Sequence, residues 1–225
     1  MRLSRDQMAA RVATELQDGW YVNLGIGIPT LTSSYVPPGR EVILQSENGL
    51  VGLGPLVSDP SRRDPQLINA SKEHVSLVTG ASIVHHADSF AMIRGKHLDA
   101  AVLGGMQVSE LGDLANWRVP GEPMGSIGGA MDVAVGAKEL FVVMTHTTRE
   151  GAPKIVRKCT YPLTALGVVK KIFTDIAVIS VTAQGLVLDE VVEGWSPHAV
   201  QACTEPKLQV SPELRTITVS ELLPD

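Results

Sequence analysis

The residue with the clearest chemical potential in this chain is a glutamate that stands among turn-forming residues. Glu47 follows a strand-like segment, Glu41–Gln45, and is flanked by Ser46, Asn48 and Gly49. In an open α/β sheet the carboxyl ends of the strands are where ligands bind, and a carboxylate there can act as a nucleophile or a base. An Asn-Gly pair is also typical of a tight turn, and the local sequence alone favours a turn in which Glu47 faces water.

Two glycine-containing segments could bind an anion or a developing negative charge. Asn23 precedes a Gly25-Ile26-Gly27 loop, and glycine loops that open a helix can bind anions through backbone N–H groups. The loop lacks the spacing of a dinucleotide-binding fingerprint, so a tight strand-to-helix turn is the simpler interpretation. The segment Ser126–Asp132 opens a helix, where N–H groups could face an oxyanion; plain helix-start geometry explains it equally well.

Other reactive residue types carry weaker signals. Lys72 could hold an anionic ligand, but a surface lysine beside Glu73 more often forms a solvated ion pair. His85 and His86 are adjacent, so they point apart on a strand and do not face each other on a helix, which argues against a shared metal ion. Cys159 has no obvious His partner, so neither a nucleophilic cysteine nor a metal site is predicted.

Short strands and helices alternate along the chain and must position these residues. Strand-like segments are Tyr21–Leu24, Glu41–Gln45, Val75–Val78, Ala100–Leu103, Leu140–Met144, Ile176–Val181 and Leu186–Leu188, and helix-like segments between them include Asp88–Arg94 and Met131–Lys138. This alternation predicts an α/β fold with an open, mainly parallel sheet flanked by helices. The stretch 104–129 is rich in Gly, Pro and polar residues and is predicted to be a functional loop.

The two ends of the chain have their own signals. Ser4 and Gln7 have the spacing of a capping box, and apolar residues then recur with a helical period up to a predicted stop at Gly19. Residues 1–225 are predicted to form one domain, in which 196–225 is a C-terminal appendage that begins as a helix.

Composition narrows the class of protein. The 225 residues are 44% hydrophobic and 19% charged, which is typical of a globular chain, and the formal net charge is −5. The negative charge and the lack of a basic stripe argue against nucleic acid as a partner. No apolar run is long enough for a membrane span, and two cysteines without metal-type spacing fit a cytoplasmic protein with reduced thiols.

Several stretches, taken together and in order, resemble the B subunit of the 3-oxoacid CoA-transferases. The resemblance covers most of the chain, and Ser-Glu-Asn-Gly in this setting is a specific signature, so it overturns the interpretation of Glu47 as a turn residue only. The matching stretches are 23–29, 46–49 with the following Gly-Leu-Gly-Pro, 67–70, 88–90, 112–117 and 128–132.

The resemblance implies a CoA-transferase type I fold and covalent catalysis by Glu47. The glutamate would attack an acyl-CoA donor such as succinyl-CoA, become a glutamyl-CoA thioester, and pass the CoA to a 3-oxo acid, either acetoacetate or 3-oxoadipate. It also implies a separate A subunit as partner, which would carry most of the CoA-binding surface, in a heterotetramer of two A and two B chains. No metal or redox cofactor is implied, since the CoA thioester is a substrate.

The same resemblance implies supporting roles for other residues. Gly129 and Ala130 match a backbone loop that stabilises the oxyanion. Asn23 matches an active-site amide, and Lys72 matches a lysine near the site. Three glycines, Gly25, Gly27 and Gly49, would let the CoA substrate approach the backbone.

Two alternatives to CoA transfer stay open from the sequence. An acyl-CoA hydrolase would use water as the acceptor and would not respond to a 3-oxo acid. A non-catalytic module of the same fold would bind a metabolite without turnover, because fold alone does not determine function. The intact Ser46–Gly49 motif argues against such a module.

Overall fold

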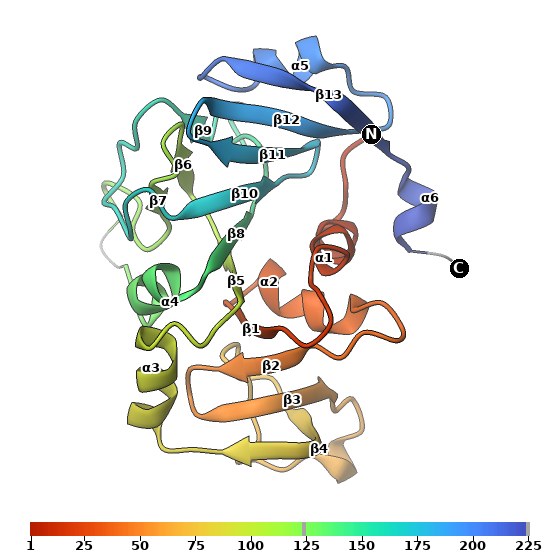
Figure 1. The fold of residues 1–225 in the computed structure, drawn as a ribbon, viewed down its shortest axis with the longest axis vertical. Helices are drawn as coiled ribbons and strands as arrows, with labels where there is room; N and C mark the ends of the chain where they lie inside the picture. Colours follow the sequence, from red (N-terminus) through yellow and green to blue (C-terminus); the bar gives the residue numbers. More distant parts are fainter. Residues whose placement is uncertain (123–124, 224–225) are drawn as a thin grey trace.

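The computed structural model describes residues 1–122 and 125–223, in which a ten-stranded mixed sheet runs the length of the molecule (Figure 1). Across the sheet the strands lie in the order β13 (Leu208–Ile217), β12 (Gly185–Val192), β11 (Ala177–Thr182), β10 (Val169–Phe173), β8 (Glu139–Val143), β5 (Ala100–Gly104), β1 (Tyr21–Leu24), β2 (Ile43–Ser46), β3 (Leu50–Leu56) and β4 (Val75–Ile83). A small second sheet contains β7 (Leu114–Ala115), β6 (Gln107–Ser109) and β9 (Ile155–Val156).

The centre of the large sheet is parallel and its two flanks contain antiparallel pairs. Strands β10, β8, β5, β1 and β2 are neighbours that run in the same direction. Antiparallel pairs join β2 to β3 and β3 to β4 on one side, and β10 to β11 and β11 to β12 on the other. The predicted open α/β fold is therefore confirmed, and the antiparallel flanks are an addition to the predicted parallel sheet.

Helices cover both faces of the sheet, as the sequence of the central strands requires. In β5, Ala101 and Leu103 face one hydrophobic cluster while Ala100 and Val102 face the other. A strand that is apolar at every position is buried on both sides. One face packs against α3 (His86–Arg94), α4 (Ala130–Gly136) and α5 (Pro197–Ala202), and the other against α1 (Arg5–Ala13), α2 (Ile28–Leu31) and α6 (Val219–Leu222). Short 3-10 helices span Thr32–Tyr35 and Pro60–Arg62.

Helix α1 begins where the sequence predicts and ends earlier. The Ser4 hydroxyl accepts from the Gln7 backbone N–H, and the Gln7 side chain accepts from the Ser4 N–H, so the capping box is present. The helix ends at Ala13, not at Gly19. Gly19 instead has a φ of +77° in the turn before β1, where its N–H donates to the Glu41 carbonyl (2.7 Å). The glycine signal marked the turn and not the last helical residue.

The C-terminal segment is less separate than predicted. Helix α5 occupies its start, as expected, but β13 is a ten-residue edge strand that pairs in parallel with β12. Part of the segment 196–225 therefore belongs to the main sheet; residues 224–225 lie outside the described residues. Alternating apolar and polar residues in Leu208–Ile217 are the strand signal that a two-proline segment obscured.

A buried ion pair joins α1 to the sheet. The Arg11 guanidinium donates two hydrogen bonds to the Glu190 carboxylate on β12, at 2.6 Å and 2.9 Å, and both side chains are buried. Arg11 also donates to Glu15 (2.7 Å), and Arg215 on β13 donates to Glu190. Bidentate geometry and extra partners are what such a desolvated pair needs. Within the described residues, no helix is long and apolar enough to cross a membrane.

Replacing Glu190 by Gln should lower the free energy of unfolding by about 3 kcal/mol, because a buried guanidinium loses a charged partner. Glu15 still pairs with Arg11, which keeps the loss moderate. Urea denaturation measures the change. Lys138→Ala is the matched control, since it removes an exposed pair with Asp99 (2.7 Å) and should cost less than about 1 kcal/mol. Equal losses in the two variants would contradict this account of α1 docking.

Candidate active site

Glu47 lies in a tight hairpin turn at the carboxyl end of β2. The chain leaves β2 at Ser46, turns through Glu47, Asn48 and Gly49, and returns as β3, with the Gly49 N–H donating to the Ser46 carbonyl (3.0 Å). Gly49 has a φ of +112°, and a Cβ atom there would collide with the Val84 carbonyl oxygen. The turn thus requires glycine, and it places Glu47 at the edge where the parallel strands end.

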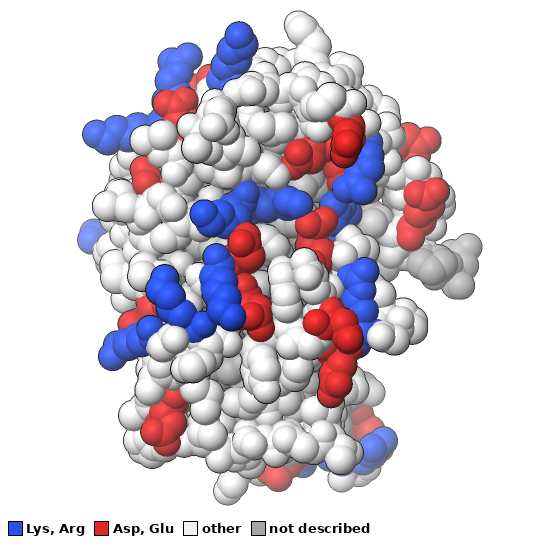
Figure 2. All heavy atoms as spheres, viewed as in Figure 1, with Lys and Arg blue, Asp and Glu red and all other residues white. Residues whose placement is uncertain are grey.

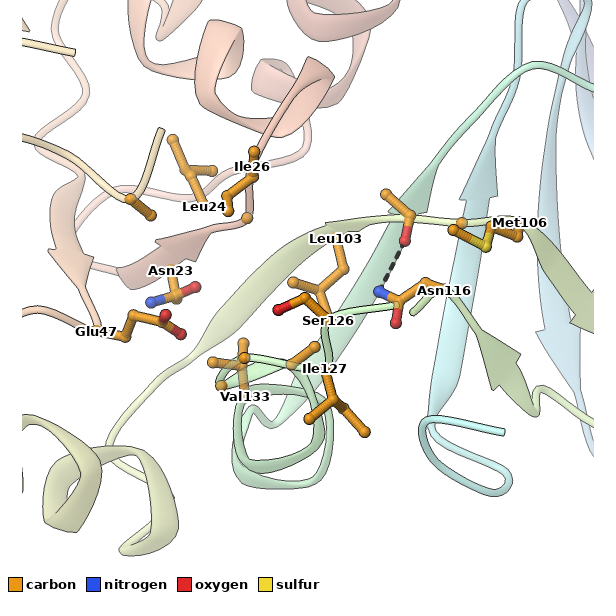
Figure 3. Close-up of a pocket in the computed structure, with 17 residues that line it drawn as sticks. Asn23, Leu24, Ile26, Glu47, Leu103, Met106, Asn116, Ser126, Ile127 and Val133 are labelled. Atoms are coloured by element: carbon orange, nitrogen blue, oxygen red, sulfur yellow. Dashed lines mark hydrogen bonds between the residues drawn. The ribbon is translucent and has the colours of Figure 1, made fainter. Parts of the chain in front are cut away.

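The Glu47 side chain is half-buried in the wall of a cavity of about 390 Å³ (Figure 3). The cavity brings together the glycine segments around Gly25 and Gly129, although they lie far apart in the chain. Its lining comes from the ends of β1, β2 and β5, from the start of α4 and the loop before it, and from the loops before β4 and after β7. It comprises Asn23, Leu24, Gly25, Ile26, Glu47, Ala70, Leu103, Gly104, Gly105, Met106, Asn116, Ser126, Ile127, Gly128, Gly129, Ala130 and Val133.

Asn23 is held beside Glu47 by a buried chain of hydrogen bonds. Its amide nitrogen donates to both the backbone carbonyl (3.2 Å) and the side-chain oxygen (2.7 Å) of Gln45. Gln45 in turn donates to the Ser89 hydroxyl (2.6 Å), which donates to the Ser46 carbonyl (3.2 Å). Both amide hydrogens of Asn23 are therefore engaged, and in this arrangement its oxygen is the group it can offer to a ligand.

The backbone at Gly129 lies directly against the Glu47 carboxylate. A Cβ atom on Gly129 would overlap Glu47 Oε2 and would come within 2.8 Å of Phe90 Cζ. Gly129 is the N-cap of α4, so the carboxylate faces a helix start with no intervening side chain. The Ala130 N–H already donates to the Ile127 carbonyl (3.0 Å), which leaves the Gly129 N–H as the candidate donor of this pair.

Burial and nearby charges set the pKa of Glu47. Desolvation raises the pKa above that of an ordinary glutamate, and Asp132 on α4 raises it further, while His86 on α3 opposes both. The His86 ring packs edge-on against Phe90 (4.8 Å between centroids), and its Nδ1 lies 3.4 Å from the Glu47 carbonyl oxygen. Asp132 is paired with Arg94 (2.7 Å). The Glu47 carboxylate is thus partly shielded from water, and His86 offsets part of its negative charge.

The structure does not bring all predicted site residues to the cavity. Lys72 is exposed in a turn with a φ of +63°, and it is not among the lining residues, although Ala70 of the same loop is. Gly27 lines a different surface hollow, next to Arg5. Gly49 shapes the hairpin and does not line the cavity.

The chain matches the model of the family described as "Coenzyme A transferase" over residues 5–202. The chain belongs to the coenzyme A transferase family. Among its relatives, the B subunit of 3-oxoadipate CoA-transferase from Pseudomonas putida is 54% identical over 84% of this chain and 89% of its own. The B subunit of succinyl-CoA:3-ketoacid coenzyme A transferase from Helicobacter pylori is 47% identical over 92% of this chain and 99% of its own.

A solved acyl-CoA transferase of Escherichia coli shares the fold, with a TM-score of 0.78 at 19% identity. The superposition covers all of this chain and 46% of that longer one. At this identity the likeness bears on the fold alone.

Several wall residues of this coenzyme A transferase were not found from the sequence. Leu103 and Met106 stand at the end of β5, where an apolar strand end carried no chemical signal. Asn116 donates to the Gly104 carbonyl (3.0 Å) and accepts from Thr164 (2.6 Å), which fixes the far wall. Gln45 and Ser89 hold Asn23 in place through hydrogen bonds. The sequence indicated this part of the site only through the motif stretches near these two residues.

Gly129→Ala should reduce kcat by about 100-fold, because the added methyl group displaces the Glu47 carboxylate by an ångström or more. Steady-state kinetics and a thermal unfolding curve measure the effect and check the fold. Gly104→Ala adds the same methyl group to the cavity wall at a point with nothing within 4 Å and should have a much smaller effect. Equal kinetic losses would show that cavity filling, and not displacement of Glu47, is responsible.

The raised pKa of Glu47 predicts how the enzyme responds to acid. A carboxyl group attacks a carbonyl only when ionised, so kcat/KM should fall as the pH drops through a pKa above the ordinary glutamate value. Asp132→Asn removes a charge that raises this pKa, so the acid limb should move to lower pH. His86→Ala removes a group that lowers it and should move the limb to higher pH. Profiles that coincide with the wild type in both variants would contradict the assignment of the limb to Glu47.

Proposed function

We propose that this chain is the B subunit of a 3-oxoacid CoA-transferase that moves CoA from an acyl-CoA donor such as succinyl-CoA to a 3-oxo acid. The observation that carries the proposal is the half-buried Glu47 carboxylate, set against the Gly129 backbone in a glycine-lined cavity. The names of the Pseudomonas and Helicobacter relatives support the reaction class.

In the proposed mechanism Glu47 is a nucleophile and each step exchanges one acyl bond for another. The carboxylate attacks the thioester carbonyl and expels the CoA thiolate, which leaves a mixed anhydride between Glu47 and the acyl group. The thiolate then attacks the glutamyl carbonyl, which releases the donor acid as its carboxylate and leaves a glutamyl-CoA thioester. The carboxylate of the 3-oxo acid repeats these steps in reverse order and leaves with the CoA.

The described residues account for the parts of this mechanism that the protein must supply. Partial burial removes water from a carboxylate that would otherwise be a weak nucleophile. The Gly129 N–H can donate to the oxyanion of each tetrahedral intermediate, and it needs no side-chain movement to do so. Asn23, fixed by Gln45, keeps the opposite wall in place. Binding energy from the remote part of CoA holds the thioester in position.

The proposal includes a partner and involves no metal or redox cofactor in the reaction. The relatives are named as B subunits, so an A subunit is proposed, in a heterotetramer of two A and two B chains. The acceptor is acetoacetate or 3-oxoadipate, the two acids that the resemblance implies. An acceptor panel with the reconstituted enzyme decides between them.

Glu47→Gln should abolish transfer, with a loss of activity of at least about 1,000-fold, because an amide cannot form the anhydride. Incubated with succinyl-CoA, the wild-type assembly should gain the mass of CoA less one water on Glu47, which peptide mass spectrometry locates. Glu41→Gln, at an exposed glutamate just before β2, is the control and should keep both the adduct and the activity. Full activity without Glu47 would overturn the proposal. Thioester loss that is unaffected by a 3-oxo acid would indicate a hydrolase instead.

A further inference from the structure

A second, open groove of about 640 Å³ adjoins the cavity that contains Glu47. Met106 lines both, so the two spaces meet at this side chain. The groove lies beyond the end of β8, and the cavity floor lies beyond the end of β5; these are neighbouring parallel strands in which Gly104 pairs with Val143. A ligand that extends from the cavity into the groove would pass this side chain.

The groove carries positive charge and many hydroxyl groups. Arg2, Arg149 and Lys154 line it, together with the hydroxyl groups of threonines and of Tyr161. Its one lining carboxylate among the described residues, Asp175, is already paired with Arg2 (2.6 Å). Figure 2 shows that acidic and basic side chains are interspersed over the face it displays. A concave surface with excess positive charge favours an anionic group.

Lys154 is the side chain that most needs such a group. It is partly buried, and among the described residues the one hydrogen-bond partner of its Nζ is the Thr145 hydroxyl, at 3.4 Å. Among residues 1–122 and 125–223, no ion pair joins it to a carboxylate. Burial lowers the pKa of Lys154 to about 8, which Asp175 only partly offsets. A partly desolvated ammonium without a close counter-ion is costly, and a bound anion would relieve that cost.

Strand spacing shows which part of a substrate reaches Lys154. Glu47 follows β2 and Thr145 follows β8, and between β2 and β8 lie β1 and β5. Three strand-to-strand steps amount to about 14 Å. The arm of CoA between its sulfur and first phosphorus has thirteen bonds, about the length of four extended residues, or roughly 14 Å. The carbon chain of a four- to six-carbon diacid is only about half as long.

The cavity wall between Glu47 and the groove suits the arm of CoA. Leu24, Ile26, Leu103, Met106 and Ile127 make the passage largely apolar. The Gly104 carbonyl in this wall already accepts a hydrogen bond from Asn116. An aliphatic arm with two amides fits such a passage better than a charged chain does.

We propose that the groove lined by Arg2, Arg149 and Lys154 binds the phosphate groups of the CoA thioester whose carbonyl lies against Glu47. This inference rests on the proposed function and adds a CoA-binding site on the present chain itself. Lys154 is its central contact, and Arg149 is the exposed cation at its rim.

The test compares two thioesters in the assembled two-subunit enzyme. Lys154→Met should raise the KM for succinyl-CoA about ten-fold or more, the loss of one charge-assisted contact, and leave the KM for succinyl-pantetheine, which has no phosphate, nearly unchanged. Lys154→Arg should restore most of the affinity for succinyl-CoA. Lys158→Met removes an exposed lysine outside the groove and is the control. Circular dichroism confirms that each variant is folded.

Other outcomes overturn the inference. An equal rise in KM for both thioesters would mean that Lys154 contacts the carboxylate of the succinyl group or stabilises the fold. A donor without a distal carboxylate, such as acetoacetyl-CoA, separates these two roles. With this donor the rise in KM disappears if Lys154 contacts the succinyl carboxylate, and it persists if Lys154 stabilises the fold. An unchanged KM for succinyl-CoA would exclude a phosphate contact. Calorimetric titration with adenosine 3′,5′-bisphosphate tests the groove without turnover, so failure of the transferase reaction and failure of this site are distinguishable.

Discussion

The contact between the Glu47 carboxylate and the Gly129 backbone joins the two halves of the active site. The carboxylate comes from a hairpin between β2 and β3, and the backbone comes from the start of α4, which packs on one face of the sheet. Each element is placed by its own hydrophobic packing, yet the contact has no room for even a methyl group. The shape of the cavity and the burial that raises the pKa of Glu47 both depend on how closely these two segments approach.

The rest of the fold maintains that approach. Central strands that are apolar on both faces are packed between two helical layers, and close packing of this kind has low compressibility. On the face opposite α4, the Arg11–Glu190 pair ties α1 to β12 by directional bonds that apolar packing cannot supply. Sites on the ends of strands are more tightly positioned than sites on free loops.

Four of the five central parallel strands were predicted, because apolar runs in a parallel sheet have a simple pattern; β10 was missed, because Lys170 and Lys171 interrupt its apolar run. Strand β3 was also missed, since its Gly-Leu-Gly-Pro residues disfavour a strand; register shifts in its pairing with β4 accommodate them. At the site, residue types and motif resemblance brought Glu47, Asn23 and Gly129 into view. They could not reveal that Asn23 engages both its amide hydrogens with Gln45, because that depends on three-dimensional neighbours. Lys72 could not be placed, because an exposed turn has few packing constraints visible in sequence.

Hydrogen bonding fixes the spacing of adjacent strands, so the separation across the sheet between Glu47 and the cationic groove follows from the strand order. In the proposed arrangement, substitutions along the cavity wall alter the space for the acyl group and leave the distance from Glu47 to the groove unchanged. In that arrangement the distance from Glu47 to the groove stays constant and matches the arm of CoA, which all the acyl-CoA substrates share. The shape of the cavity around the acyl group is free to vary. Only the insertion or loss of a whole strand would change the distance between Glu47 and the groove.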